Sequence, residues 1–155
     1  MNTERKDVAS NRKAFHEYFV LERYEAGIEL AGTEVKSIRA GNINLKDSFC
    51  TVKNGELFLH GMHISPYSHG NIFNKDPVRP RRLLMHKKEI SRLHATLMTD
   101  GVRLIPLCVY FNGSLIKIEL GLCKGKKLHD KRDSAAERES KRDMERILKE
   151  RRTME

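Results

Sequence analysis

An Asn-Gly dipeptide between two long apolar stretches constrains the fold of this chain more than any other feature. Asn112-Gly113 separates Val102–Phe111 from Leu115–Cys123, and such a dipeptide tolerates the positive φ angles of a tight hairpin turn. In the second stretch apolar and polar residues alternate, which is typical of a strand with one buried and one wet face. The sequence therefore predicts a hairpin of two long strands, with Pro106 placing the first at an edge or at a bulge.

The remaining apolar sequence also indicates short strands. A second hairpin is predicted at Asn54-Gly55, and residues 15–30 form an aromatic and β-branched stretch with a bend at Gly27. Two small helices are predicted at Thr33–Ala40 and Lys87–Thr99. A mainly β fold with two small helices follows, and an OB-like β-barrel is the natural candidate at this length.

Charge and hydropathy divide the 155 residues into three parts. Residues 1–12 are polar and are predicted to form a flexible N-terminal arm, whereas residues 13–123 hold nearly all the apolar side chains and form the barrel. Residues 124–155 contain 12 Lys or Arg and 8 Asp or Glu, with too few apolar residues to dock firmly on a core. We expect this basic tail to be disordered alone and helical when bound to phosphates, the alternative being a solvated charged helix.

The overall charge indicates a class of partner. A formal net charge of +9 suggests a polyanion. No apolar run approaches the ~20 residues of a membrane span, and the charged start lacks the apolar segment of a secretory signal. Three widely spaced cysteines fit a reducing compartment. We therefore expect a cytoplasmic protein that makes no contact with a membrane.

The sequence contains no recognisable catalytic, metal or cofactor motif. His60-x-x-His63 would place its two side chains on opposite faces of a strand, and a Gly-rich phosphate loop is absent. The chain contains no Gln, which excludes hydrolysis of peptidyl-tRNA by a Gly-Gly-Gln tripeptide of the release-factor type. We expect no enzymatic activity, no cofactor and no metal.

Basic residues form two groups within the predicted barrel. Arg79, Arg81 and Arg82 lie beside prolines on an extended loop, where planar guanidinium groups suit phosphate contacts. A solvated loop is the alternative. Lys36 and Arg39 share one face of the first predicted helix, although an ordinary amphipathic surface has the same pattern.

Several strings of residues resemble those of one known family. They are residues 11–19 (NRKAFHEYF), 25–30 (EAGIEL), 32–41 (GTEVKSIRAG), 76–84 (DPVRPRRLL) and 125–132 (GKKLHDKR). Together they have the order and spacing of the small protein B family, the SsrA-binding proteins of bacterial trans-translation.

This resemblance implies a function and a set of partners. An OB-like barrel would bind the tRNA-like part of transfer-messenger RNA (tmRNA, or SsrA RNA) and deliver it to stalled ribosomes. The tail would sense the decoding centre and the empty mRNA channel of the small ribosomal subunit. Elongation factor Tu and alanyl-tmRNA would share the complex. A generic OB-type protein that accepts many RNAs is the alternative.

The resemblance also carries over to individual positions. Together with the basic groups above, the positions expected to contact tmRNA are Asn11, His16, Glu25, Lys36, Arg39, Arg81, Arg82, Leu84 and Lys117. The positions expected at the decoding centre are Gly125, Lys126, Lys127, His129, Asp130, Lys131 and Arg132. The positions expected on a tail helix in the mRNA channel are Arg138, Arg142, Arg146, Ile147, Leu148 and Lys149.

Four of these positions have a chemical argument of their own. Glu25 would repel phosphates but can accept a hydrogen bond from a base amino group, unless it is a structural partner of a neighbouring Arg. Lys117 points outward if the flanking isoleucines point inward, which leaves its amine available to phosphate. Leu84 either belongs to the core or packs on an exposed base. His129 supplies a flat ring that can stack on a base.

Overall fold

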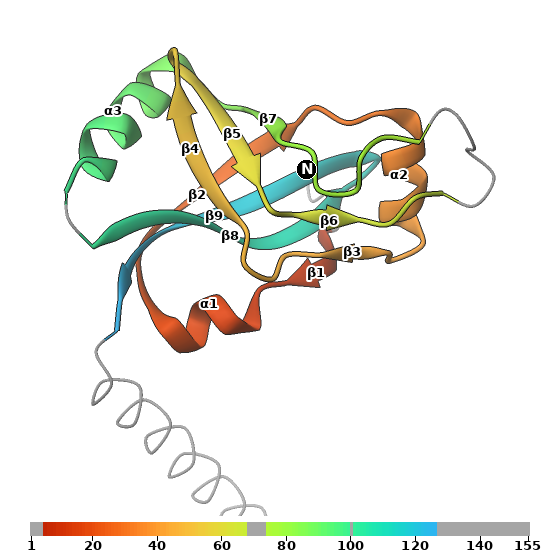
Figure 1. Ribbon diagram of the computed structural model, residues 1–155, viewed down its shortest axis with the longest axis horizontal. Coiled ribbons are helices and arrows are strands. Elements are labelled where there is room, and N and C mark those ends of the chain that lie inside the picture. The colour runs from red at the N-terminus through yellow and green to blue at the C-terminus, as the bar shows by residue number, and fades with distance from the viewer. Residues whose placement is uncertain (1–4, 68–73, 100, 127–155) are drawn as a thin grey trace, which may run out of the picture.

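The computed structural model describes residues 5–67, 74–99 and 101–126 (Figure 1). The strands are β1 (Arg5–Ser10), β2 (Tyr18–Ile28), β3 (Ile43–Asn44), β4 (Phe49–Lys53), β5 (Glu56–His60), β6 (His63–Ile64), β7 (Arg81–Leu84), β8 (Val102–Asn112) and β9 (Leu115–Gly125). The helices are α1 (Arg12–Glu17), α2 (Gly32–Arg39) and α3 (Lys87–Leu97). Within these described ranges, no helix is long and apolar enough to cross a bilayer.

The strands confirm the expected mainly β fold. Seven of them form one antiparallel sheet in the order β1-β8-β4-β5-β7-β2-β9, and the further pairing of β8 with β9 closes the ring of strands into a barrel. Short strands β3 and β6 form a separate ladder. Figure 1 shows α2 and α3 on opposite sides of this barrel.

Both predicted Asn-Gly hairpins are present. Asn54 and Gly55 have φ angles of 53° and 76° between β4 and β5, and Gly113 has a φ of 63° between β8 and β9. Of the edge position and the bulge that the sequence predicts for Pro106, the bulge is confirmed, because the pairing of β8 with β9 shifts between Pro106 and Cys108. Proline has no backbone N–H to donate, and at a bulge the two strands can pair without that hydrogen bond.

The core fills the interior of the barrel and its surface beneath the helices. The inward side chains of β5, β7, β8 and β9 are almost fully buried, and α2 and α3 add further apolar residues. Members exposed by 5% or less include Leu57, Leu59, Leu83, Leu104, Ile118, Leu120, Ile38, Ile90 and Leu93. The alternation predicted for the last strand therefore points Ile116, Ile118, Leu120 and Leu122 inward and leaves Lys117 and Glu119 on the other face.

The N-terminal region differs from the expected flexible arm. Residues 5–10 form β1 and pair with β8 from Arg5↔Asn112 to Ser10↔Cys108. The physical reason is that β8 offers backbone groups along this edge, and an added strand satisfies them. The arm prediction is therefore wrong for these residues.

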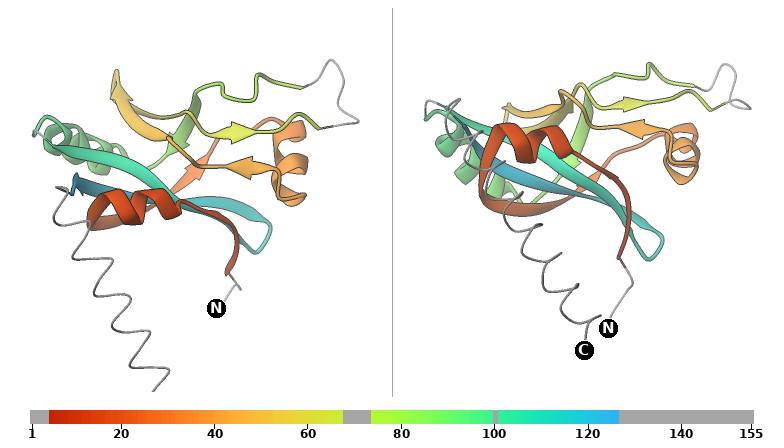
Figure 2. Two further views of the ribbon diagram at one scale, coloured as in Figure 1. Left: turned by 60° about the horizontal axis from the view of Figure 1, so that its bottom comes forward. Right: turned by 90° about the horizontal axis from the view of Figure 1, so that it is seen from below.

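A third small helix, α1, replaces the expected beginning of a strand at residues 12–17. The side chain of Asn11 caps this helix, since its Oδ1 accepts a hydrogen bond from the backbone N–H of Ala14 at 3.2 Å. Ala14 also packs in a small cluster with Ile105, Leu107 and Cys123. Figure 2 shows α1 lying across the outer side of the strands that carry these residues.

Candidate RNA-binding surface

Three of the predicted RNA contacts meet around Gly27 on β2. The register pairs Gly27 with Leu84 of β7 on one side and with Lys117 of β9 on the other. Residues directly across a ladder share a face, and Glu25, two positions earlier in β2, lies on that same face. Leu84 is 49% exposed, so it belongs to the surface rather than the core. We call Glu25, Gly27, Leu84 and Lys117 the Gly27 patch.

Gly27 itself shapes the centre of this patch. A Cβ atom built at this position would lie 3.3 Å from the Cβ and 3.6 Å from the Cδ1 of Leu84. A larger side chain would therefore displace Leu84 and would cover the strand between Leu84 and Lys117. Glycine keeps these two side chains accessible to the same ligand.

Glu25 is held in place by a tyrosine hydroxyl, not by the arginine considered from the sequence. The Oη of Tyr110 donates a hydrogen bond to Oε2 of Glu25, and β8 places Tyr110 directly across from Lys117. Burial and the nearby Glu25 carboxylate both raise the pKa of Tyr110. The tyrosine therefore stays a neutral donor, and the carboxylate keeps its second oxygen for a ligand.

A second carboxylate beside the patch is neutralised by two arginines. Glu119 lies 2.8 Å from Nη2 of Arg5 and 2.6 Å from Nη1 of Arg23. Its burial would raise the pKa of Glu119, but the hydrogen bonds from Arg23 and Arg5 outweigh this effect and hold the pKa below its usual range. The Arg5 guanidinium also lies 4.0 Å from the ring centroid of Tyr110. Sequence reasoning missed Arg5 and Tyr110, because their place depends on the pairing of β1 with β8.

Two other predicted contacts are exposed, Arg82 beside the patch and His16 at the far end of β2. Arg82, next to Leu84 on β7, lies 3.3 Å from Glu56 and 3.8 Å from Glu29 in ion pairs that are open to solvent. Exposed pairs of this kind contribute little, so Arg82 can exchange its partners for a phosphate at small cost. His16 is exposed on α1.

The two basic residues of α2 are also exposed. The Lys36 ammonium lies 5.2 Å from the ring centroid of Tyr67, and the Arg39 guanidinium lies 5.7 Å from that of Phe111. Cation–π contacts at exposed sites are weak. Both cations therefore remain available at the margin of the barrel.

The structure argues against the phosphate contact that the sequence predicts for Arg81. Its side chain is 0% exposed, with Nε donating to Oε2 of Glu34 at 2.7 Å and Nη1 donating to the carbonyl of Met62 at 2.7 Å. Strand alternation explains the result, because Arg81 points inward together with Leu83 while Arg82 points outward. This alternation of inward and outward side chains, with a period of two residues, can be read from the sequence itself.

The partner of Arg81 is a buried carboxylate at the beginning of α2. Glu34 is 4% exposed and accepts hydrogen bonds from Arg79, from Arg81 and from the backbone N–H of Ala31 at 2.9 Å. Burial alone would raise the pKa of Glu34, but these hydrogen bonds lower it below the ordinary value. Two of the three loop arginines therefore fasten residues 79–81 to α2 instead of facing RNA.

Asn11 is likewise a structural residue. Its side chain is 5% exposed, and Nδ2 donates to the carbonyls of Pro106 at 3.0 Å and Leu45 at 3.4 Å. Because Oδ1 caps α1, every polar atom of this side chain faces protein. These partners argue against the direct contact of Asn11 with RNA that the resemblance implies. The residue instead positions the helix that carries His16.

Of the residues expected at the decoding centre, the structure describes Gly125 and Lys126. The backbone N–H of Lys126 donates to the carbonyl of Glu17 at 2.9 Å, and its Nζ donates to the carbonyl of Phe15 at 3.3 Å. The beginning of the tail is thus fastened to α1. The predicted tail residues from Lys127 onward lie outside the described residues.

Comparison with known proteins identifies the family. The family model described as SmpB protein matches residues 8–150. The SsrA-binding protein of Acetivibrio thermocellus is 58% identical over 147 residues, which are 95% of this chain and 96% of that protein. The SsrA-binding protein of Desulforudis audaxviator is 60% identical over 144 residues, covering 93% and 94% of the two chains.

A solved structure supports the same family assignment. A chain from the structure described as "tmRNA-SmpB: a journey to the center of the bacterial ribosome" is 45% identical, with a TM-score of 0.68. The match covers 82% of this chain and 93% of that one. From the match over residues 8–150 and the near-full-length relatives it follows that this chain belongs to the SmpB protein family.

Proposed function

We propose that this protein binds the tRNA-like part of tmRNA and delivers it to stalled ribosomes for trans-translation, as an adaptor without catalytic activity. The observation that carries the proposal is the Gly27 patch, where three positions matched to the family's tmRNA contacts lie on one face. The relatives are SsrA-binding proteins, and the similar solved chain comes from a structure of tmRNA with SmpB, which supports the same partner.

The three side chains of the patch offer three kinds of contact. The Glu25 carboxylate accepts a hydrogen bond from a base amino group, the Leu84 side chain packs on a base, and the Lys117 ammonium pairs with a phosphate. This combination suits a folded RNA that exposes bases, more than a regular duplex recognised by its backbone.

The surrounding cations extend the RNA surface. Lys36, Arg39 and Arg82 supply supporting contacts, His16 on α1 supplies a further polar contact, and Arg5 and Arg23 offset the charge of Glu119 beside the patch. Gly125 and Lys126 begin the segment proposed for the decoding centre, and the tail from residue 127 is proposed for the mRNA channel. Elongation factor Tu and alanyl-tmRNA would be present in the same complex, in the cytoplasm.

Selective binding to tmRNA is the first expected result. At matched salt, the protein should bind the tRNA-like fragment on the order of 10³-fold more tightly than bulk RNA, as specific nucleic-acid binders do. Replacing Lys117 with Ala should reduce the slope of log affinity against log salt by about one unit, because one phosphate contact is lost. Filter-binding titrations with competitor RNA at several salt concentrations measure both quantities.

Lys53→Ala is the matched control for this experiment. Lys53 is an exposed lysine at the end of β4 and lies outside the Gly27 patch, so the variant should keep the slope of the unmodified protein. Equal affinity for both RNAs would favour the generic OB-type protein and contradict the proposal.

The hydrogen bond from Tyr110 to Glu25 is expected to contribute to RNA affinity. Glu25→Gln and Tyr110→Phe should each weaken binding of the tRNA-like fragment about tenfold, which corresponds to ~1.4 kcal/mol. The double variant should bind no more weakly than Glu25→Gln alone, since Tyr110 acts through the orientation of that carboxylate. Binding titrations with the four proteins give the coupling.

Tyr24→Phe provides the control, because Tyr24 also donates to a glutamate, Glu22, but lies on the opposite face of β2. This variant should keep its RNA affinity. Strictly additive losses in the double variant would show that Tyr110 and Glu25 act independently.

A further inference from the structure

We propose that Phe49 and Arg103 form a second RNA-binding site, which stacks one unpaired nucleobase and holds its phosphate. The site rests on the proposed function only in that RNA is the partner. It is separate from the Gly27 patch, and the base could come from tmRNA or from ribosomal RNA.

Phe49 is an exposed aromatic ring that is already held in position. It is 43% exposed and stacks on His60 across the β4–β5 ladder, with the ring centroids 5.3 Å apart and the planes 20° from parallel. The His60 ring is fixed in turn by a hydrogen bond of 2.8 Å between Nε2 and Oγ1 of Thr51. Because one face of Phe49 is covered by His60, its exposure comes from the opposite face and the ring edges.

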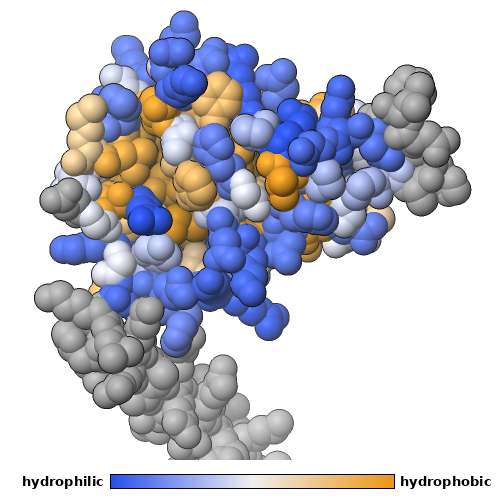
Figure 3. Space-filling model, in the orientation of Figure 1, coloured by the Kyte–Doolittle hydropathy of each residue, from blue (hydrophilic) through white to orange (hydrophobic). Residues whose placement is uncertain are grey.

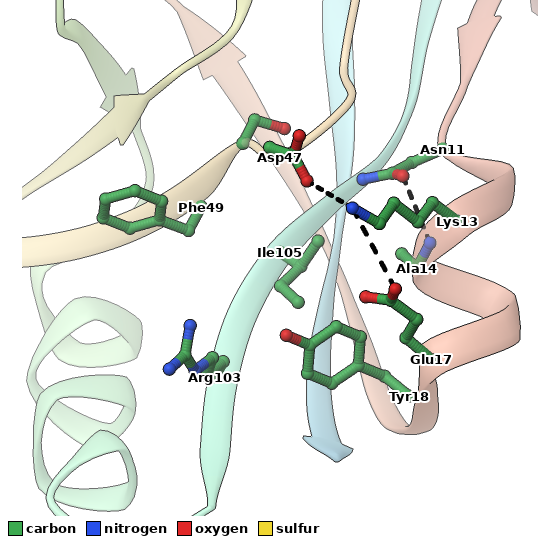
Figure 4. A pocket seen from close by; sticks show the side chains of 10 residues that line it. Asn11, Lys13, Ala14, Glu17, Tyr18, Asp47, Phe49, Arg103 and Ile105 are labelled. Carbon is green, nitrogen blue, oxygen red and sulfur yellow. Dashed lines mark hydrogen bonds and ion pairs between the residues drawn. The ribbon is translucent and has the colours of Figure 1, made fainter. Parts of the chain in front are cut away.

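Two pockets meet at Phe49 and Arg103. One of about 290 Å³ lies toward α1 and includes Asn11, Tyr18 and Ile105 (Figure 4). The other, of about 390 Å³, lies toward α3, and its lining is more apolar. Figure 3 shows hydrophobic side chains gathered between α3 and β4 on this face of the molecule. A planar ligand stacked on Phe49 therefore has space to extend toward α1 or toward α3.

Arg103 is the residue beside these pockets that can meet a phosphate. Lys13 pairs with Asp47 at 2.7 Å and approaches Glu17 at 4.0 Å, so one lysine is shared by the two acidic residues of the first pocket (Figure 4). Arg103 is exposed and forms no ion pair or side-chain hydrogen bond with any residue in the described ranges. An aromatic face beside an uncommitted guanidinium is the combination that binds single-stranded RNA.

The position of this site allows both surfaces to be occupied together. Arg103 pairs with Cys123 near the end of β9, from which the tail continues, whereas Lys117 pairs with Tyr110 near the β8–β9 turn. The two sites therefore lie toward opposite ends of the same hairpin. An adaptor that holds one RNA at the Gly27 patch can present Phe49 to a second RNA segment near the end of β9.

The direct test uses the full-length protein and an unstructured hexaribonucleotide that carries 2-aminopurine. Phe49→Leu and Arg103→Ala should each weaken its binding about tenfold, because stacking or phosphate pairing is lost. Phe49→Tyr keeps a planar ring and should bind within twofold of the unmodified protein. Phe19→Leu is the matched control, since Phe19 is also 43% exposed but lies beneath the Lys126 ammonium at 5.0 Å.

Two further titrations distinguish the source of the base. Weaker binding of Phe49→Leu and Arg103→Ala to small ribosomal subunits assigns the base to ribosomal RNA, and weaker binding to the tRNA-like fragment assigns it to tmRNA. Either result supports the site. Unchanged affinity of both variants for the hexanucleotide and for both larger RNAs overturns it. The affinity of the unmodified protein for the tRNA-like fragment tests the proposed function separately, and thermal melts confirm that each variant is folded.

Discussion

Replacing Glu34 with Gln is expected to lower the free energy of unfolding at neutral pH by about 3 kcal/mol. Arg81 is fully buried, and its nearest anionic partner is the Glu34 carboxylate at 2.7 Å. Removing that charge leaves a buried guanidinium without compensation, which costs more than the loss of an exposed ion pair. Urea unfolding followed by circular dichroism measures the difference.

The pH dependence of this effect has a definite sign. The pKa of Glu34 is lowered in the folded protein, so the carboxylate stabilises the fold fully above its unfolded pKa of about 4.3. That stabilisation is lost as the pH falls through the folded pKa. The difference in unfolding free energy between the unmodified protein and Glu34→Gln should therefore be constant near neutrality and shrink in acid.

Glu29→Gln is the control for Glu34. Glu29 is an exposed glutamate whose carboxylate lies 3.8 Å from Arg82, and its replacement should change the unfolding free energy by less than about 0.5 kcal/mol. If the two variants lost equal stability, the buried position of Glu34 would not be the cause.

The parts of the fold that were predictable depend on short-range signals. Asn54-Gly55 and Asn112-Gly113 specify their turns by local backbone preference, and the alternating side chains of residues 115–123 specify which face is buried. α1 and β1 could not be predicted in this way. β1 exists because β8 pairs with it, and these partners are about a hundred residues apart in the sequence.

The same distinction applies to the site. Resemblance supplied Glu25, Leu84 and Lys117, but a strand pattern gives only the face of a residue and not its neighbour on the next strand. Only the strand register of the structure therefore shows that these three residues lie together around Gly27. Strand alternation alone separates a buried Arg81 from an exposed Arg82. The prediction instead treated the three arginines as one loop that binds phosphate.

Ending the chain after Lys126 is expected to leave tmRNA binding largely intact and to abolish tagging of nascent peptides on stalled ribosomes. The sequence suggested a boundary after Cys123, but β9 continues to Gly125, which pairs with Tyr18. Lys126 adds hydrogen bonds to α1. A cut after Cys123 would remove these contacts and would confuse a loss of tail function with a loss of barrel stability.

The expected separation of the two activities has an energetic reason. Residues 127–155 offer Met144, Ile147 and Leu148 as their clustered apolar side chains, so removing the tail sacrifices little apolar burial. The Gly27 patch is built entirely from β2, β7 and β9. The tail's repeated cations instead suit an RNA-lined channel, where phosphates relieve their mutual repulsion.

A tagging assay on ribosomes stalled at the end of a message, run beside titrations with the tRNA-like fragment, tests this separation. Replacing Ile147 and Leu148 with Asp in the full-length chain keeps the length of the tail and should spare tmRNA binding while reducing tagging. Normal tagging by the protein ending at Lys126 would contradict the proposed role of the tail. Loss of tmRNA affinity along with tagging would assign the tail to RNA recognition, because the barrel keeps all of its strand pairs in that protein.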